Sequence, residues 1–281
     1  YDLAINFEAD IRSNFLLWIA GAARRVGFGQ AGGGPLLTDV VPHDPRRHVA
    51  EGGLRLVGRA FDTAPAPLPS AENGSDAWRL AVPDAARAEA RRMLESVMPG
   101  TGDIVAVHVG AGRAVKQWPP ERFGEAAAML ARDPGARIVF TGAPEDAPLV
   151  DAALARAREL GAPAASISGG TDLVQLAALL GQCRALVTGD TGPMHLAAAV
   201  GTPVVAIFGP SMPWRYGPLG HARVVRIDLP CSPCNRIRRP PARCTVGIPD
   251  CLAGIGVETV VAAARDLLRE PAASPAPADR P

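Results

Sequence analysis

The sequence has a single lysine, Lys116, and no excess of charge of either sign. Its 29 basic and 28 acidic residues give a formal net charge of +1, so no global field recruits nucleic acid or an anionic membrane. Any anion must therefore be bound by a local group of residues. The longest apolar run, residues 14–23, is too short to cross a bilayer, and no secretory signal stands at the start. We expect a soluble cytoplasmic protein that does not bind nucleic acid.

Several motifs are missing as well. The five cysteines are too few for a disulfide scaffold in 281 residues. There is no G-x-S-x-G nucleophile motif and no phosphate-binding P-loop. No D-x-D metal clamp occurs either, so a leaving group that develops negative charge would need compensation from protein groups. These absences argue against a serine hydrolase and a P-loop nucleotidase.

The hydrophobic content is 48%, which is enough for two domains with separate cores. Tyr1 leads directly into strand-like residues 2–7 with no preceding cap or loop, which indicates that the start is truncated. The first part, residues 1–98, reads as a partial α/β domain. Residues 62–76 form a Pro-, Ala- and Ser-rich connection, and we place the domain boundary at Pro99-Gly100. The remaining predicted elements of this part are strand 25–28 and helices 15–22, 48–61 and 84–97.

From residue 99 to 269 apolar strands alternate regularly with helices. This alternation predicts a parallel sheet covered on both faces, which binds ligands outside the carboxyl ends of its strands. The predicted strands are 104–109, 137–141, 164–168, 185–188, 203–208 and 223–227, and the predicted helices are 120–131, 147–160, 173–180, 193–200 and 257–268. Residues 270–281 read as a disordered tail.

The first candidate site lies in residues 187–210, VTGDTGPMHLAAAVGTPVVAIFGP. A strand ends near Gly189, Asp190 and Thr191 can cap the next helix, and the amides of Thr191 and Gly192 would face the ligand-binding edge. A diphosphate there would meet these amides and the positive end of the helix dipole. His195, about one turn into the helix, can face the same site. The alternative is an ordinary capped turn with a buried histidine.

The second candidate site lies in residues 107–123, VHVGAGRAVKQWPPERF. In Gly110-Ala111-Gly112 the small side chains allow a ligand to approach the backbone closely. The only lysine, Lys116, follows, which suggests a position that needs a compact ammonium. The alternative is that Lys116 is simply the one lysine left after a drift of the composition toward arginine. We assign Trp118 to helix packing.

The loop at residues 141–146 also follows a strand. Glu145 or Asp146 there could accept hydrogen bonds from ribose hydroxyls, as acidic residues do in many nucleotide sites. For Asp146 we favour the alternative, a cap of the helix that starts near Ala147.

Four cysteines, Cys231, Cys234, Cys244 and Cys251, form a C-x2-C-x9-C-x6-C pattern. The spacing permits a four-thiolate zinc site. The second half lacks a CxxC pair, and reduced cysteines that pack a long loop, or disulfides formed on oxidation, explain the pattern as well. We favour no metal.

These segments resemble the ADP-heptose:lipopolysaccharide heptosyltransferases, which form glycosyltransferase family 9. The resemblance is carried by the Lys-x-Trp-Pro block, by GDTGPMHLAAAVGTPVVAIFGP, and by the CSPC…C…CL run before the last helix. It also includes the N-terminal YDLAINFEADIRSNFLLWIAGAARRVGF, so it covers nearly the whole chain.

The resemblance implies a GT-B fold of two doubly wound Rossmann-like domains, the first of them incomplete. It implies that the second domain holds the donor ADP-heptose, that the first holds a lipopolysaccharide-core or other lipid-linked glycan acceptor, and that transfer inverts the anomeric configuration without a metal or other cofactor. We further expect a monomer at the inner face of the inner membrane, with peripheral membrane association.

By the same resemblance, Lys116 and Asp190 are the expected catalytic residues, and Glu145 would bind the adenosine ribose. The residues expected at the donor are Gly110, Ala111, Gly112, Lys116, Glu145, Asp190, Thr191, Gly192 and His195.

Two departures from the family pattern matter. The acidic residue thought to be the general base belongs to a segment before Tyr1, so we expect inefficient turnover from this chain. Asn6 stands where relatives often have Asp, which leaves the acceptor open. Two alternatives therefore stay open: a nucleotide-binding module without catalysis, and a zinc-stabilised interaction protein.

Overall fold

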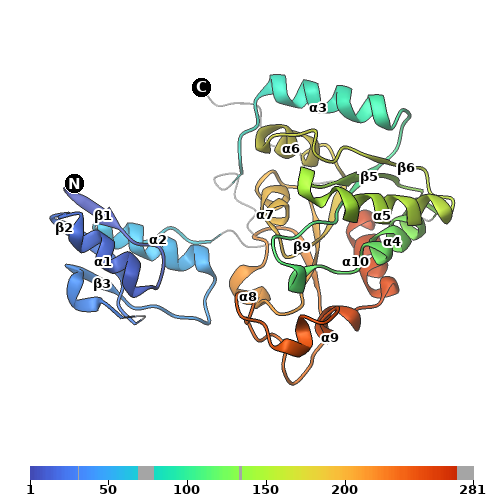
Figure 1. Ribbon diagram of the computed structural model, residues 1–281. Helices are drawn as coiled ribbons and strands as arrows, with labels where there is room; N and C mark the ends of the chain where they lie inside the picture. Colours follow the sequence, from blue (N-terminus) through green and yellow to red (C-terminus); the bar gives the residue numbers. More distant parts are fainter. Residues whose placement is uncertain (31, 69–78, 133–134, 271–281) are drawn as a thin grey trace. The chain divides into compact units, whose positions relative to one another are not determined.

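The computed structural model describes residues 1–30, 32–68, 79–132 and 135–270. The chain divides into two compact units (Figure 1). The first comprises Tyr1–Leu68 together with the short segment Trp214–Tyr216, and the second contains the rest. Both are built on parallel sheets, so the predicted α/β class is confirmed.

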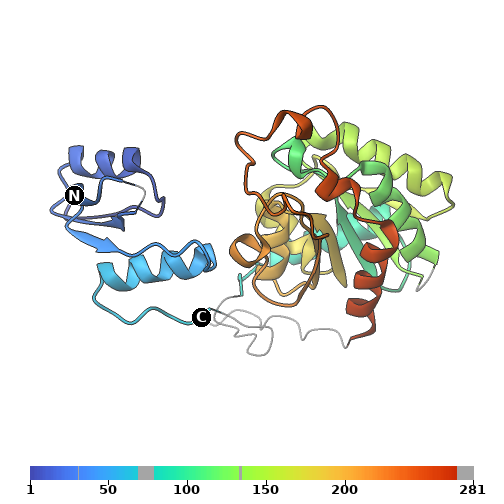
Figure 2. The same ribbon diagram turned by 90° about the horizontal axis from the view of Figure 1, so that it is seen from below.

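The first unit contains a three-stranded parallel sheet in the order β1-β2-β3. Helix α1 covers one face and α2 the other, which Figure 2 shows edge-on. The core consists of apolar side chains from β2, β3 and α2, including Phe28 and the fully buried Val26 and Leu56. The elements are β1 (Leu3–Ile5), α1 (Ile11–Ile19), β2 (Arg24–Phe28), η1 (Gly34–Leu36), β3 (Asp39–Val41) and α2 (Val49–Ala60).

Two elements of this unit differ from the prediction. Helix α1 begins at Ile11 rather than near residue 15, because the Asp10 carboxylate accepts a hydrogen bond from the Arg12 amide and caps the helix. Strand β3 was not predicted, since it has only three residues and follows a Gly- and Pro-rich stretch.

The second unit contains a six-stranded sheet in the order β6-β5-β4-β7-β8-β9, and every neighbouring pair is parallel. The chain winds from β4 outward to β6, returns to the other side of β4, and winds outward again to β9. The switch point therefore lies between β4 and β7. The strands are β4 (Ile104–His108), β5 (Arg137–Thr141), β6 (Ala164–Ser166), β7 (Ala185–Gly189), β8 (Val204–Ile207) and β9 (Ala222–Val225), which confirms the six predicted strands.

Helices form a layer on each side of this sheet. One layer consists of α4 (Pro120–Arg132), α5 (Ala147–Glu159) and α10 (Val257–Arg269), and α10 lies beside α4 in both views (Figures 1 and 2). The other consists of α3 (Asp84–Val97), α6 (Leu173–Leu180) and α7 (Gly192–Ala199). The strands between them are almost completely buried, as expected for a parallel sheet with helices on both faces.

Helix α3 lies in the second unit, whereas the predicted boundary at Pro99-Gly100 placed it in the first. It packs against α6 through an apolar stripe that buries Ala90 and Leu94. The Gln182 side-chain amide also donates to the Arg87 carbonyl at 2.7 Å. The amphipathic pattern predicted this helix but not the partner of its apolar face.

Residues 69–76 of the predicted connection and 271–281 of the predicted tail lie outside the described residues. Within the part of the chain that is described, no helix is both long enough and apolar enough to traverse a bilayer. Two short helices, α8 (Pro213–Tyr216) and α9 (Asp250–Ala253), complete the fold.

Candidate functional site

Three loops meet at the carboxyl edge of the second sheet. The loop after β4 contains Gly110, Ala111 and Gly112 and ends in η3 (Ala114–Lys116), the loop after β5 contains η4 (Pro144–Asp146), and β7 leads into α7. Because β4 lies between β5 and β7, the three loops are neighbours. The predicted position of the site, at the switch point of the sheet, is thus occupied by the predicted segments.

Lys116 and Asp190 form an ion pair across this edge. The Lys116 Nζ lies 2.8 Å from the Asp190 Oδ2, and the side chains are 18% and 10% exposed. An ammonium has three N–H donors, so one carboxylate leaves donor capacity toward the open side of the loops. The pair therefore places a fixed, partly buried cation beside the start of α7.

The first turn of α7 provides a backbone donor and free space. Thr191 is the N-cap, and its side chain makes no capping hydrogen bond. Pro193 has no N–H, and the Met194 amide donates to the Thr191 carbonyl at 3.2 Å, so the Gly192 amide is the one at the start of α7 that needs another partner. A Cβ built on Gly192, or on Gly112 in the facing loop, would meet nothing within 4 Å. The backbone of both loops is therefore accessible to an anionic ligand.

Gly110 lies directly against the Asp146 carboxylate. A Cβ at Gly110 would come within 2.0 Å of the Asp146 Oδ2, which no side chain could tolerate. The same oxygen accepts a hydrogen bond from the Ala143 amide at 3.1 Å. Asp146 is the N-cap residue of α5, but its side chain makes no capping hydrogen bond to that helix, so the predicted cap is wrong. The carboxylate stabilises the preceding turn instead, and the neighbouring Glu145 is exposed on the same turn.

Two further predictions about this region can be checked. His195 is exposed on α7, so the alternative of a buried histidine is wrong. Trp118 is 1% exposed and packs edge-on against Phe123 with ring centroids 4.8 Å apart. Its indole N–H donates to the Ile255 carbonyl at 3.2 Å. The assignment of Trp118 to packing is confirmed.

A row of buried polar side chains beneath the loops was not predicted. His108 ends β4 and pairs in register with Thr141 of β5 and Thr188 of β7. Its Nδ1 lies 3.1 Å from the Thr141 Oγ1, and burial lowers the pKa of His108 to about 4, opposed by the nearby Asp146 carboxylate. The sequence shows a His or Thr near the carboxyl end of each of these strands, but only the register of the three strands brings the side chains together.

Two buried hydroxyls at this end of the sheet are unsatisfied. Within the residues that the structure describes, the Thr188 Oγ1 and the Ser211 Oγ have no hydrogen-bond partner. Thr188 is fully buried and immediately precedes the Gly189-Asp190 turn. Unpaired buried hydroxyls are costly and are typical of sites that complete their hydrogen bonds with a ligand or water.

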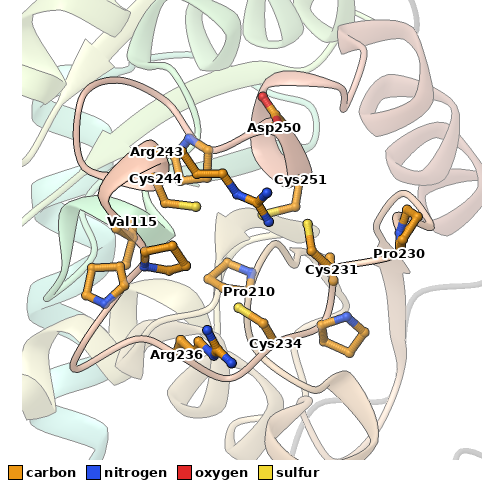
Figure 3. Close-up of a pocket in the computed structure, with 15 residues that line it drawn as sticks. Val115, Pro210, Pro230, Cys231, Cys234, Arg236, Arg243, Cys244, Asp250 and Cys251 are labelled. Atoms are coloured by element: carbon orange, nitrogen blue, oxygen red, sulfur yellow. The ribbon is translucent and has the colours of Figure 1, made fainter.

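The four late cysteines line one cavity of about 490 Å³ (Figure 3). All four are free thiols in this structure, and disulfides formed on oxidation stay a prediction. Among the described residues, no group of three or more His, Cys, Asp or Glu side chains is arranged to hold a metal ion. The geometry therefore gives no support to the zinc site proposed for Cys231, Cys234, Cys244 and Cys251.

Asn6 has a structural role in the first unit. Its Nδ2 donates to the Asn14 Oδ1 at 2.7 Å, and the Asn14 Nδ2 in turn donates to the carbonyls of Phe28 and Gly32. Asn6 is 5% exposed and Asn14 is fully buried. The amide at position 6 thus helps to join β1, α1 and the end of β2.

Comparison with known proteins identifies the family of the chain. The model of glycosyltransferase family 9 (heptosyltransferase) matches residues 1–242 of this chain. The chain belongs to glycosyltransferase family 9. The predicted family membership is thereby confirmed, and the match includes residues 107–123 and 187–210.

Among curated family 9 proteins, lipopolysaccharide heptosyltransferase 2 of Escherichia coli (strain K12) is 32% identical over 114 residues. The aligned stretch covers 40% of this chain and 32% of that relative, so it spans about a third of the relative's length.

Two solved structures of family 9 proteins extend the likeness over most of the chain. The family 9 glycosyltransferase from Veillonella parvula DSM 2008 has a TM-score of 0.71 at 25% identity and covers 95% of this chain and 73% of that one. E. coli ADP-heptose lipopolysaccharide heptosyltransferase II has a TM-score of 0.70 at 26% identity, with coverage of 95% and 76%. The predicted GT-B type, with Rossmann-like α/β domains, is confirmed.

Proposed function

We propose that this protein transfers a heptose, or a related sugar, from an ADP-sugar to a lipopolysaccharide core or another lipid-linked glycan. The observation that carries the proposal is the Lys116–Asp190 ion pair beside the unpaired Gly192 amide at the start of α7. A cation and an unpaired N–H group at the switch point of a doubly wound sheet are suited to a nucleotide diphosphate. Family membership supplies the donor class.

In this proposal the donor lies along the carboxyl edge of the second sheet. The donor contacts the backbone of residues 110–112, because the space beside Gly112 is open and leaves room for the donor. The Lys116 ammonium and the amides of Thr191 and Gly192 bind the diphosphate, Asp190 orients the ammonium, Glu145 accepts from the ribose hydroxyls, and His195 supports the sugar end.

The proposed reaction inverts the anomeric centre. An acceptor hydroxyl attacks the anomeric carbon from the face opposite the diphosphate and gives its proton to a general base, while the bond from that carbon to the diphosphate oxygen breaks. Negative charge then builds on the leaving ADP. The Lys116 ammonium and the α7 amides are already placed where this charge develops, which lowers the barrier without a metal ion.

The remaining parts of the proposal concern surroundings and assembly. The acceptor is bound by the first unit, as the family resemblance implies. The protein acts as a monomer in the cytoplasm at the inner face of the inner membrane, requires no cofactor, and binds no nucleic acid.

A transfer assay tests the proposal. The protein is incubated with ADP-heptose and a lipopolysaccharide that lacks outer heptose, and the acceptor mass is measured with and without EDTA. We expect one added heptose in both conditions, at the low turnover predicted from the sequence. Calorimetry with ADP-heptose runs in parallel, and tight binding without any transfer would instead assign the protein to nucleotide binding alone.

A further inference from the structure

The loop between β9 and α9 is strongly basic in a protein of almost neutral charge. Residues 229–249 include four arginines and no Asp or Glu. All four arginines are exposed, and within this described stretch none forms an ion pair with a carboxylate. Many arginines elsewhere do have carboxylate partners, for example Arg156 with Glu125 and Glu159. The four are Arg236, Arg238, Arg239 and Arg243.

The same loop exposes apolar side chains. Val246 is 89% exposed and Ile248 is 50% exposed, and the two lie two residues apart in the chain. Five prolines in the loop, including Pro240 and Pro241, remove backbone N–H donors that would otherwise need water. The loop thus combines positive charge, exposed aliphatic groups and few free backbone donors.

The loop folds back on itself around the cavity that contains the four cysteines. Residues from both halves of the loop line it, and the Arg243 side chain points in among the cysteines (Figure 3). The loop is anchored at Gly209, whose carbonyl accepts from the Ser232 hydroxyl at 2.8 Å. Arg238 and Arg239 are not among the lining residues, so their guanidinium groups are left for an external partner.

We infer that residues 229–249 form a docking surface for an anionic phospholipid bilayer. Exposed arginines that form no ion pair, such as Arg238 and Arg239, are attracted to anionic headgroups, and exposed aliphatic side chains of the same loop can enter the interfacial region. Arg243 contributes less, because Asp250 lies near it. Single-stranded nucleic acid would favour aromatic stacking platforms, and the loop contains no aromatic residue. The inference rests on the proposed function in one respect, because it names the surface through which the protein would reach the membrane. Vesicle binding needs neither donor nor acceptor, so its failure is distinguishable from a failure of the transfer reaction.

Sedimentation with vesicles tests the inference. The protein is mixed with vesicles of phosphatidylethanolamine containing 30% phosphatidylglycerol, chosen as the probe, and with vesicles of phosphatidylcholine alone. We expect binding to the anionic vesicles only. The double variant R238Q/R239Q should bind at least tenfold more weakly, at about fivefold for each arginine, and V246S should lose roughly tenfold.

The matched control is R91Q/R92Q, which removes an adjacent, exposed arginine pair from α3 of the same unit. It should bind vesicles like the wild type. Equal losses for the two double variants, or wild-type binding by both R238Q/R239Q and V246S, would overturn the inference. Binding of a single-stranded oligonucleotide that R238Q/R239Q abolishes, without any vesicle binding, would also overturn it and assign the loop to nucleic acid.

Discussion

The ammonium of Lys116 lies 2.8 Å from the carboxylate of Asp190, although the two residues follow different strands of the sheet. They meet because β4 and β7 are neighbours at the switch point. Both side chains are largely buried, so each charge depends on the other for compensation in the absence of a ligand. The pair keeps the only lysine of the chain in one place before a donor arrives.

Replacement of Lys116 tests its role in the chemistry. Lys116→Ala should reduce kcat/KM by roughly 10²-fold or more, since a preorganised charge contact is worth about 3 kcal/mol in the transition state. Lys116→Arg should also be impaired, because a planar guanidinium does not reproduce a compact ammonium beside Asp190. Steady-state kinetics with the transfer assay measure both, and unfolding curves establish that the variants are folded.

Wild-type kinetics for Lys116→Ala would remove Lys116 from the mechanism. Full activity of Lys116→Arg alone would show that only the charge matters and that the compact shape does not.

The two glycines of the β4 loop should respond differently to the same substitution. Gly110→Ala places a methyl group against the Asp146 carboxylate, so it should destabilise the protein by about 1–3 kcal/mol and weaken ADP binding. Gly112→Ala points into open space and should leave the free energy of unfolding unchanged. Chemical denaturation of both variants measures the difference, and equal effects would contradict the described loop geometry.

The buried His108 should make stability depend on pH. Its pKa is lowered from 6.5 to about 4 in the folded chain, so the unfolded chain binds the proton first. Above pH 6.5 His108 is neutral in both states and does not lower the free energy of unfolding. As the pH falls from 6.5 toward 4, proton uptake by the unfolded chain lowers the free energy of unfolding by about 3 kcal/mol at most. His108→Gln keeps a hydrogen-bonding side chain without titration. Urea unfolding at several pH values should show that the free energy of unfolding falls less in acid for this variant than for the wild type. An identical pH profile for the two proteins would show that His108 does not cause the pH dependence.

Asn6 should not tolerate replacement by aspartate. Asn6→Asp replaces the Nδ2 donor by an oxygen that faces the Asn14 Oδ1, and Asn14 cannot flip without losing its bonds to two carbonyls. The expected cost at neutral pH is about 1–3 kcal/mol. In acid the new carboxyl is protonated and can donate again, so the difference from wild type should shrink. A variant as stable as the wild type at neutral pH would show that the network is dispensable.

The sequence was sufficient to predict the six strands of the second sheet and the three loops at its edge. Each strand is an apolar run that ends at a loop with Gly, Asp or Thr, and such signals are local. The partners of these elements were not predictable in the same way. The contact between α3 and α6 and the adjacency of β4 and β7 depend on tertiary topology, which the order of strands along the chain does not reveal.

The row of His108, Thr141 and Thr188 shows another reason for a missed feature. Each of these residues is unremarkable in its own strand, and only the register of three parallel strands brings them side by side. The unpaired hydroxyl of Thr188 likewise becomes visible only when its surroundings are known.

The most direct test of the account compares ADP and AMP as calorimetric ligands of the wild type and of Lys116→Ala. If the Lys116 ammonium holds the diphosphate, the wild type should bind ADP at least tenfold more tightly than AMP, at about 1.4 kcal/mol for each factor of ten. In Lys116→Ala the affinity for ADP should fall to nearly that for AMP, while AMP binding changes little. An equal loss for both ligands, or an undiminished preference for ADP, would contradict the proposed phosphate site.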